Sequence, residues 1–139
     1  NQYLNTADKQ QVSDIVTSFG ILSWLTDEQQ MDVATAISGS GPAYFFYFMQ
    51  CLEEAAMANG LSATQAKLLV TQTAFGSNQL AADNIDLTKL IDSVCSPGGT
   101  TEAAMQKFQH DNDFKNIIQQ AVGAAIKRSV ELACTKPHP

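Results

Sequence analysis

The sequence has 139 residues, a formal net charge of -6 and 16% charged residues. This length is typical of one domain that can bury a sizeable core, and 45% hydrophobic residues argue against disorder. An acidic chain without a basic patch is a poor partner for nucleic acid, because duplex binding needs several Lys or Arg side chains to displace counterions. Composition therefore indicates one soluble globular domain.

The sequence shows no sign of a membrane or secretory segment. No apolar run approaches the roughly 20 residues that span a bilayer, and the first residues, NQYLNTADKQQ, lack the apolar core of a signal peptide. An initiator Met is also absent. We therefore expect a cytoplasmic protein with no membrane contact, of which this chain is a piece.

The cysteines and histidines form no disulfide framework or metal-ligand pattern. Cys51, Cys95 and Cys134 are odd in number and far apart, which fits a reducing compartment. Cys51 and Cys134 lie in apolar helical stretches and are predicted to be buried small side chains rather than reactive thiols. His110 and His138 have no second ligand at metal-binding spacing, so no metal is expected.

Hydrophobic periodicity predicts a helix over residues 7–19, followed by a short strand. The helix carries one apolar face and stops at Gly20; the face comprises Val12, Ile15, Val16 and Phe19. Ile21–Leu25 is short, apolar and aromatic, which favours a strand, and Thr26 and Asp27 suit the N-cap of a following helix. Because a lone strand cannot satisfy its own backbone groups, this strand must pair with another strand or chain.

The segment 38–42, Ser-Gly-Ser-Gly-Pro, is predicted to be a flexible turn whose Pro begins a long helix. That helix ends at Asn59-Gly60. Its aromatic stripe is typical of core packing, which we expect for Phe45, Phe46 and Phe48, with a subunit interface as the alternative for Phe46.

Further helices follow along the rest of the chain. Ser62 and Gln65 form a capping box for a helix that reaches about residue 82, and Asp86 caps a short helix to Val94. After residues 96–99, either Thr100 or Thr101 caps the next helix. A polar turn at 110–112 separates it from a last long helix that begins near Phe114. The sequence therefore predicts a mainly α domain of about six or seven helices with one short strand.

Two glycine-containing segments are candidate ligand sites. Residues 38–41 resemble a phosphate loop only superficially, since the GxGxxG spacing and a Walker Lys are both missing. Residues 96–102, Ser-Pro-Gly-Gly-Thr-Thr-Glu, combine a Pro, two glycines that allow close approach of a ligand, and two hydroxyls at a helix start. Such a segment suits a small carboxylate, although an ordinary loop with a Thr cap is the alternative.

Two motifs resemble those of a known family. The run Leu90–Ala104, LIDSVCSPGGTTEAA, is similar to the signature of pyrroline-5-carboxylate reductase, and Ala36–Tyr44, AISGSGPAY, is similar to its second hallmark. The resemblance extends over nearly the whole chain. It implies an oxidoreductase that reduces L-1-pyrroline-5-carboxylate to L-proline with hydride from NADPH or NADH, the last step of proline biosynthesis. It also implies a helical dimerisation domain like the C-terminal domain of 6-phosphogluconate dehydrogenase, in an obligate homodimer that sometimes forms a decamer.

The resemblance also implies roles for particular residues. It places the substrate carboxylate on the backbone of Gly98, Gly99, Thr100 and Thr101. The hydroxyl of Thr101 would lie near the ring nitrogen, where it donates a hydrogen bond or relays a proton, and is therefore the implied catalytic group.

The resemblance also implies ligand contacts at two more positions. Glu28 matches a Glu that contacts the substrate in some members, although a first-turn Glu favoured by the helix dipole is an equal alternative. Ser93 matches a position that can touch the cofactor. Cys95 stands where a small residue is usual, and no catalytic role is implied for it.

The family pattern begins with a Rossmann domain whose GxGxxG turn binds the dinucleotide, and nothing in this sequence resembles that turn. Residues 1–27 are interpreted as the last helix and strand of that domain, and residues 28–139 as the helical dimerisation and substrate-binding domain. We expect such a fragment to dimerise but not to turn over alone. The alternatives are a non-catalytic helical dimerisation module, or a related Rossmann-partner dehydrogenase that acts on another small acid.

Overall fold

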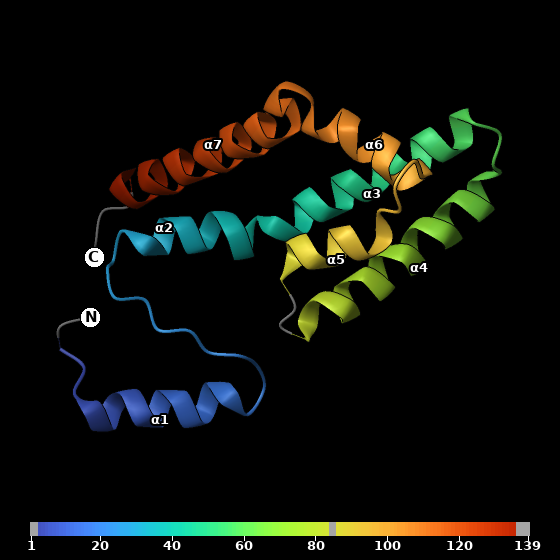
Figure 1. Cartoon of the computed structure of the whole chain (residues 1–139). Coiled ribbons are helices and arrows are strands. Elements are labelled where there is room, and N and C mark those ends of the chain that lie inside the picture. The colour runs from blue at the N-terminus through green and yellow to red at the C-terminus, as the bar shows by residue number, and fades with distance from the viewer. Residues whose placement is uncertain (1–2, 84–85, 136–139) are drawn as a thin grey trace.

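A computed structural model describes residues 3–83 and 86–135, and every regular element in these ranges is helical (Figure 1). The elements are α1 (Thr6–Thr17), α2 (Gln30–Ala34), a π-helical turn η1 (Thr35–Gly39), α3 (Gly41–Ala58), α4 (Ala63–Ala82), α5 (Leu87–Val94), α6 (Thr100–Gln109), a 3₁₀ turn η2 (His110–Asn112) and α7 (Asp113–Thr135). The mainly α class is confirmed. The strand predicted at residues 21–25 is wrong, because no other described segment is extended beside it to accept its hydrogen bonds.

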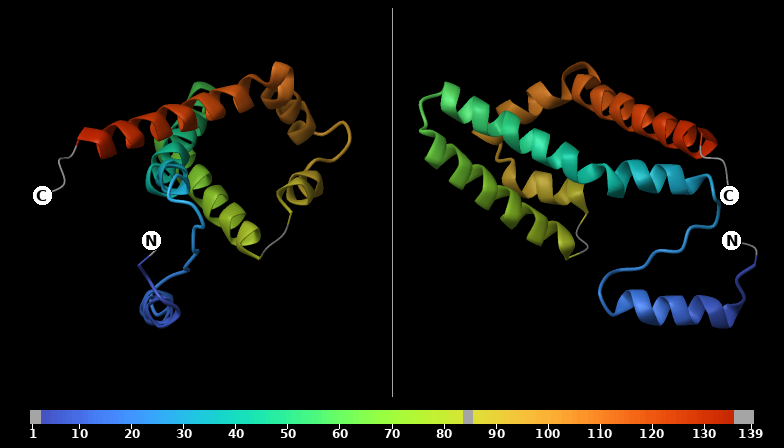
Figure 2. Two further views of the ribbon diagram at one scale, coloured as in Figure 1. Left: turned by 90° about the vertical axis from the view of Figure 1, so that its left-hand side faces the viewer. Right: turned by 180° about the vertical axis from the view of Figure 1, so that it is seen from behind.

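Helix α1 lies apart from the other helices (Figures 1 and 2). Asn5 and Asp8 cap its start with reciprocal side-chain to backbone bonds, each 3.0 Å long. Trp24, in the connection to α2, donates a 3.3 Å hydrogen bond to the Ser13 hydroxyl, and the ammonium of Lys9 lies 5.8 Å from its ring centroid. The apolar face of α1 is left largely exposed, with Ile15 64% accessible.

Helices α2 and α3 follow one another through η1, so residues 38–42 do not form the flexible turn predicted from the sequence. Ser38 and Gly39 belong to the π-helical turn, and Ser40 donates its N–H to the Thr35 carbonyl at 2.9 Å. Pro42 occupies the first turn of α3, as expected, because its missing N–H needs no acceptor there. Gly41 is buried at this junction.

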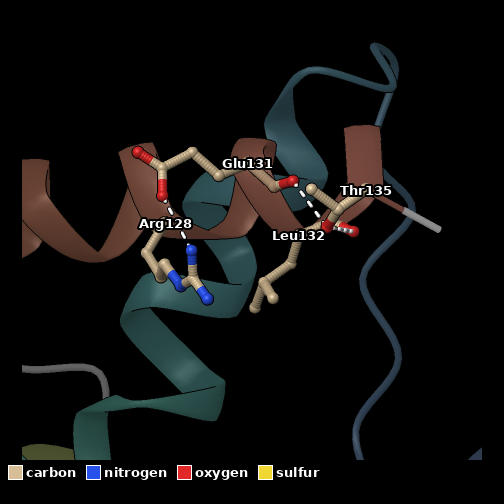
Figure 3. A network of polar contacts seen from close by, with 4 residues as sticks. All are labelled: Arg128, Glu131, Leu132 and Thr135. Carbon is tan, nitrogen blue, oxygen red and sulfur yellow. Dashed lines mark hydrogen bonds and ion pairs between the residues drawn. The ribbon is translucent and has the colours of Figure 1, made fainter.

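Helix α7 is the last helix of the described chain, and it packs against α2 and η1, which come much earlier in the sequence (Figure 1). The Ser129 hydroxyl on α7 donates a 2.6 Å hydrogen bond to the Asp32 carboxylate on α2, in a part-buried position. Ala36, which is 1% exposed, lies in η1. On its exposed side, α7 carries a 2.9 Å ion pair between Arg128 and Glu131 (Figure 3), and such surface pairs contribute little to stability.

Helices α3 and α4 lie side by side as a hairpin, seen from two directions in Figure 2. Gly60, with φ of +101°, follows the α3 C-cap Asn59 and allows the chain to reverse. The predicted capping box is confirmed, since Ser62 and Gln65 exchange side-chain to backbone bonds at the start of α4. Ala66 and Val70 of α4 are buried.

An aromatic cluster joins α3 to the α6–α7 corner. The Phe108 and Phe114 ring centroids lie 5.3 Å apart, and Phe48 lies 6.4 and 6.2 Å from them. The tilted ring pairs at these distances are favourable arrangements. The turn between α6 and α7 requires Asp111 and Asn112 to adopt positive φ, a conformation that Asn and Asp tolerate better than most residues.

The chain exposes far more surface than a compact domain of its size. Its accessible surface is 11565 Å², whereas a compact monomer of 15.0 kDa exposes about 7,000 Å². In the described ranges, the buried apolar side chains are Ala36, Ala66 and Val70. Large apolar side chains therefore remain on the surface of every long helix.

This exposure corrects two expectations. The aromatic stripe is not core within one chain, because Phe45 and Phe46 are 65% and 67% exposed and Phe48 is 40% exposed. Cys51 and Cys134 are also exposed rather than buried. Phe48 packs in part against Phe108 and Phe114, whereas Phe45, Phe46 and the two cysteines remain exposed in the described chain. Despite these apolar faces, none of the described helices is long and apolar enough to cross a membrane.

Replacing Ser129 by Ala is expected to lower the free energy of unfolding by about 1–3 kcal/mol, because the Asp32 carboxylate loses its donor in a part-buried position. Thermal unfolding at one protein concentration measures the change. Thr17→Ala is a matched control, since the Thr17 hydroxyl bonds only to its own exposed helix, and it should change stability by less than about 0.5 kcal/mol. Equal effects of the two substitutions would contradict a role for the α2–α7 bond.

Candidate functional site

The candidate ligand loop connects α5 to α6 and contains a tight turn. Helix α5 ends at Val94 with Cys95 as its C-cap, and the Gly99 N–H then donates to the Ser96 carbonyl at 2.9 Å. Gly98 has φ of +71° at the third position of this turn, and Pro97 precedes it. This order of Pro and positive-φ Gly is the pattern of a type II turn.

Gly99 is required by close packing rather than by its φ. A Cβ on this residue would lie 2.8 Å from the Ser96 carbonyl oxygen, a separation below 3.0 Å that real Cβ atoms essentially never show. Gly99 is also the N-cap of α6, and its carbonyl accepts the Ala103 N–H at 3.2 Å. The prediction of Thr100 or Thr101 as the cap is therefore wrong, because both already lie in the first helical turn.

The loop leaves a small set of backbone donors at the start of α6. The Gly98 N–H donates to a carboxylate oxygen of Glu102 at 2.7 Å, and the Gly99 N–H is held within the turn. Among the hydrogen bonds of the described residues, none takes up the N–H of Thr100 or Thr101, as is usual for the first residues of a helix. Thr100 is exposed and Thr101 is half-buried. The Glu102 N–H also lacks an acceptor in the described chain, so these three N–H groups and the two Thr hydroxyls are the donors that the start of α6 offers to an anion.

The other predicted site residues differ in their distance from this loop. Ser93 lies in the last turn of α5, where its hydroxyl donates to the Leu90 carbonyl at 2.7 Å and remains exposed. Glu28 is exposed just before α2, a helix that packs on η1 and α7. Figure 1 places that end of α2 far from the α5–α6 loop. Within one chain, Ser93 therefore lies on the helix that leads into residues 98–101, whereas Glu28 lies far from this loop.

Two polar residues were not singled out from the sequence. Glu102 holds the Gly98 N–H, and its position three residues after the N-cap is a signal that could have identified it, because Glu is favoured there as a partner for free N–H groups. The Tyr44 hydroxyl is buried without a hydrogen-bond partner among the described residues, and no sequence signal predicts that. No group of three potential metal-ligating side chains occurs in the ranges that the structure describes.

Comparison with known proteins identifies the family. Residues 28–132 match the family model described as pyrroline-5-carboxylate reductase dimerisation. The chain belongs to this family. Pyrroline-5-carboxylate reductase of Pseudomonas aeruginosa is 44% identical over 134 residues, which are 96% of this chain and 49% of that protein. The protein of the same name from Pasteurella multocida is 38% identical, over 89% of this chain and 46% of its own length.

Solved structures agree with the assignment to the pyrroline-5-carboxylate reductase dimerisation family. A pyrroline-5-carboxylate reductase from Coxiella burnetii matches with a TM-score of 0.88 at 35% identity, over 95% of this chain and 49% of the other. A pyrroline carboxylate reductase from Plasmodium falciparum, solved with NADP bound, matches with a TM-score of 0.78 at 40% identity, over 93% and 49%. The chain thus spans about half the length of the curated relatives it matches.

Replacing Gly99 by Ala is expected to cost about 1–3 kcal/mol of stability, because the added methyl group pushes on the Ser96 carbonyl and the turn must shift. Thermal unfolding measures this cost. Gly20→Ala serves as the control, since its Cβ would meet the nearest backbone atom at 3.9 Å. An unfolding temperature unchanged by Gly99→Ala would show that the turn is looser than described.

Proposed function

We propose that this chain is the dimerising and substrate-holding part of a pyrroline-5-carboxylate reductase, which reduces L-1-pyrroline-5-carboxylate to L-proline. Membership of the dimerisation family carries the proposal, and the geometry of the α5–α6 loop supports it. The reaction would be the last step of proline biosynthesis, in the cytoplasm. In this proposal, residues 28–139 form the dimerisation and substrate domain, and residues 1–27 are the last part of a preceding nucleotide-binding domain.

The substrate carboxylate would bind at the start of α6. The Thr100 and Thr101 N–H groups have no acceptor in the described chain, and the positive end of the helix dipole favours an anion there. Gly98 and Gly99 would contribute by letting the ligand approach the backbone, because their own N–H groups are held inside the loop. A carboxylate held at this point would fix the ring of a small imino acid beside the loop.

The Thr101 hydroxyl would face the ring nitrogen of that substrate. Reduction of an imine carbon requires a proton or a hydrogen-bond donor at the adjacent nitrogen, and a half-buried hydroxyl on one of the residues proposed to hold the carboxylate suits this task. Glu28 lies outside the loop of its own chain, so a substrate contact by Glu28 would have to come from the partner subunit of the dimer.

A nicotinamide cofactor, NADPH or NADH, would supply the hydride. The described residues do not form a dinucleotide cradle of their own, since Gly39 lies in a π-helical turn and Gly41 begins α3 without a preceding strand. The contribution of this chain to the cofactor would be limited to contacts near the α5–α6 loop, for which Ser93 is the proposed residue. The related Plasmodium falciparum structure contains NADP, which supports a nicotinamide cofactor.

The homodimer is supported by the excess of exposed apolar surface. The chain exposes about 4,500 Å² more than a compact monomer of its mass, or about 9,000 Å² for two copies, which is more than the total of about 2,000–5,000 Å² that obligate dimer interfaces commonly bury. Phe46 on α3 and Leu69 on α4 are among the exposed side chains that a second copy would cover. Further assembly of such dimers into a decamer is part of the same proposal.

Thr101→Ala tests the catalytic role in the complete reductase. We expect kcat/KM for pyrroline-5-carboxylate to fall roughly 100-fold, because the donor at the ring nitrogen is lost, while size-exclusion chromatography shows an unchanged dimer. Thr64→Ala, in the exposed first turn of α4, should leave turnover unchanged. Full activity of the Thr101 variant would show that this hydroxyl is not the catalytic donor.

Phe46→Asp tests the dimer in the 139-residue chain. A carboxylate buried at an apolar interface loses its hydration, so the dissociation constant of the dimer should rise at least 10-fold, as measured by sedimentation equilibrium. Thr17→Asp lies on α1, outside the residues that match the family, and should not change it. A wild-type chain that sediments as a 15.0 kDa monomer would contradict the dimer itself.

A further inference from the structure

Glu102 is a charged residue of the α5–α6 loop to which the proposed reaction assigns no role. One of its carboxylate oxygens accepts the Gly98 N–H at 2.7 Å, across four residues. The side chain is half-buried. Glu102 is the third residue of α6, where a negative charge is stabilised by the helix dipole.

The Glu102 bond ties the turn to the helix. In a type II turn the N–H of the third residue has no partner inside the turn, so Gly98 would otherwise offer a free donor beside Thr100 and Thr101. With Glu102 in place, the Gly98 amide is occupied and the Gly99 amide is held by Ser96. In the described chain, no other side chain bonds the backbone of residues 96–99.

We propose that Glu102 is a positioning residue for the substrate loop. Its carboxylate fixes the turn at residues 96–99 on the first turn of α6 and removes the Gly98 N–H from the donors that the substrate carboxylate can use. The inference rests on the proposed reductase function for its consequence on the substrate. The hydrogen bond to Gly98 is independent of that function and can be measured separately.

Two substitutions separate the acceptor from the charge. Glu102→Gln keeps a side-chain oxygen that can accept the Gly98 N–H but removes the negative charge. Glu102→Ala removes both, so Gly98 becomes a free donor and the turn is no longer tied to α6. If Glu102 acts by positioning the loop, the Gln variant should recover much of the Gly98 protection and of the substrate KM that the Ala variant loses.

The first measurement is amide hydrogen exchange at Gly98 in the 139-residue chain. We expect exchange about 10-fold faster in Glu102→Ala than in the wild type, and intermediate in Glu102→Gln, because a bond to a neutral oxygen is weaker than one to a carboxylate. Glu54→Ala is a matched control, since Glu54 also accepts a bond across four residues, from Gln50 on α3. An exchange rate at Gly98 that Glu102→Ala does not change would overturn the proposal.

The second measurement is steady-state kinetics of the complete reductase. We expect Glu102→Ala to raise KM for pyrroline-5-carboxylate about 10-fold with kcat within threefold of the wild type, and Glu102→Gln to return KM to within threefold. A Gln variant as impaired as the Ala variant, or a KM that the Ala variant leaves unchanged, would overturn the positioning role.

The two measurements distinguish this proposal from the function on which it rests. If the wild-type complete protein does not reduce pyrroline-5-carboxylate, the proposed function fails and the substrate role of Glu102 fails with it, while exchange at Gly98 still decides the hydrogen bond. If the wild type is active and only the Glu102 effects are missing, the reductase function stands and the positioning role is overturned.

Discussion

The described helices carry more apolar surface than one copy of the chain covers. This uncovered apolar surface is the main constraint on the structure. Helices α3 and α4 bury one seam between them, and α7 closes over α2 and η1, but aromatic residues such as Phe46 remain exposed. Because burial of apolar area is the main favourable term in folding, a single copy has few buried side chains to stabilise it. These exposed apolar faces agree with membership of a dimerisation family.

Among the described residues most polar interactions are local, and two contacts join elements that are far apart in the sequence. The Ser129 to Asp32 bond connects elements 97 residues apart, and the aromatic cluster around Phe114 joins α3 to the corner between α6 and α7. These contacts hold the scaffold from which the α5–α6 loop projects. The loop itself is shaped by short-range bonds from Gly98 and Gly99, so its geometry is largely independent of how the helices are covered.

Local signals in the sequence predicted local structure well. The Ser62 and Gln65 capping box, the Asp86 cap and the stop after Asn59 are all confirmed, because each depends on residues within one turn of each other. Predictions that needed a distant partner failed. The segment 21–25 is not a strand in the described chain, and Phe45 of the aromatic stripe is exposed rather than part of a core. Periodicity identifies an apolar face, but it cannot say whether the same chain or a second one covers that face.

The sequence by itself determined the helical class, most helix boundaries and the loop at residues 96–102, because caps, glycines and apolar periodicity act over a few residues. It also carried the two motifs whose family is now shown. Only the tertiary structure decided which loop donors are free: Thr100 and Thr101 keep theirs, whereas the Gly98 donor is taken by Glu102. The same holds for the π-helical junction and for the separation of Glu28 from the loop. Such features depend on the path of the backbone in space, and residue types along the chain do not specify that path.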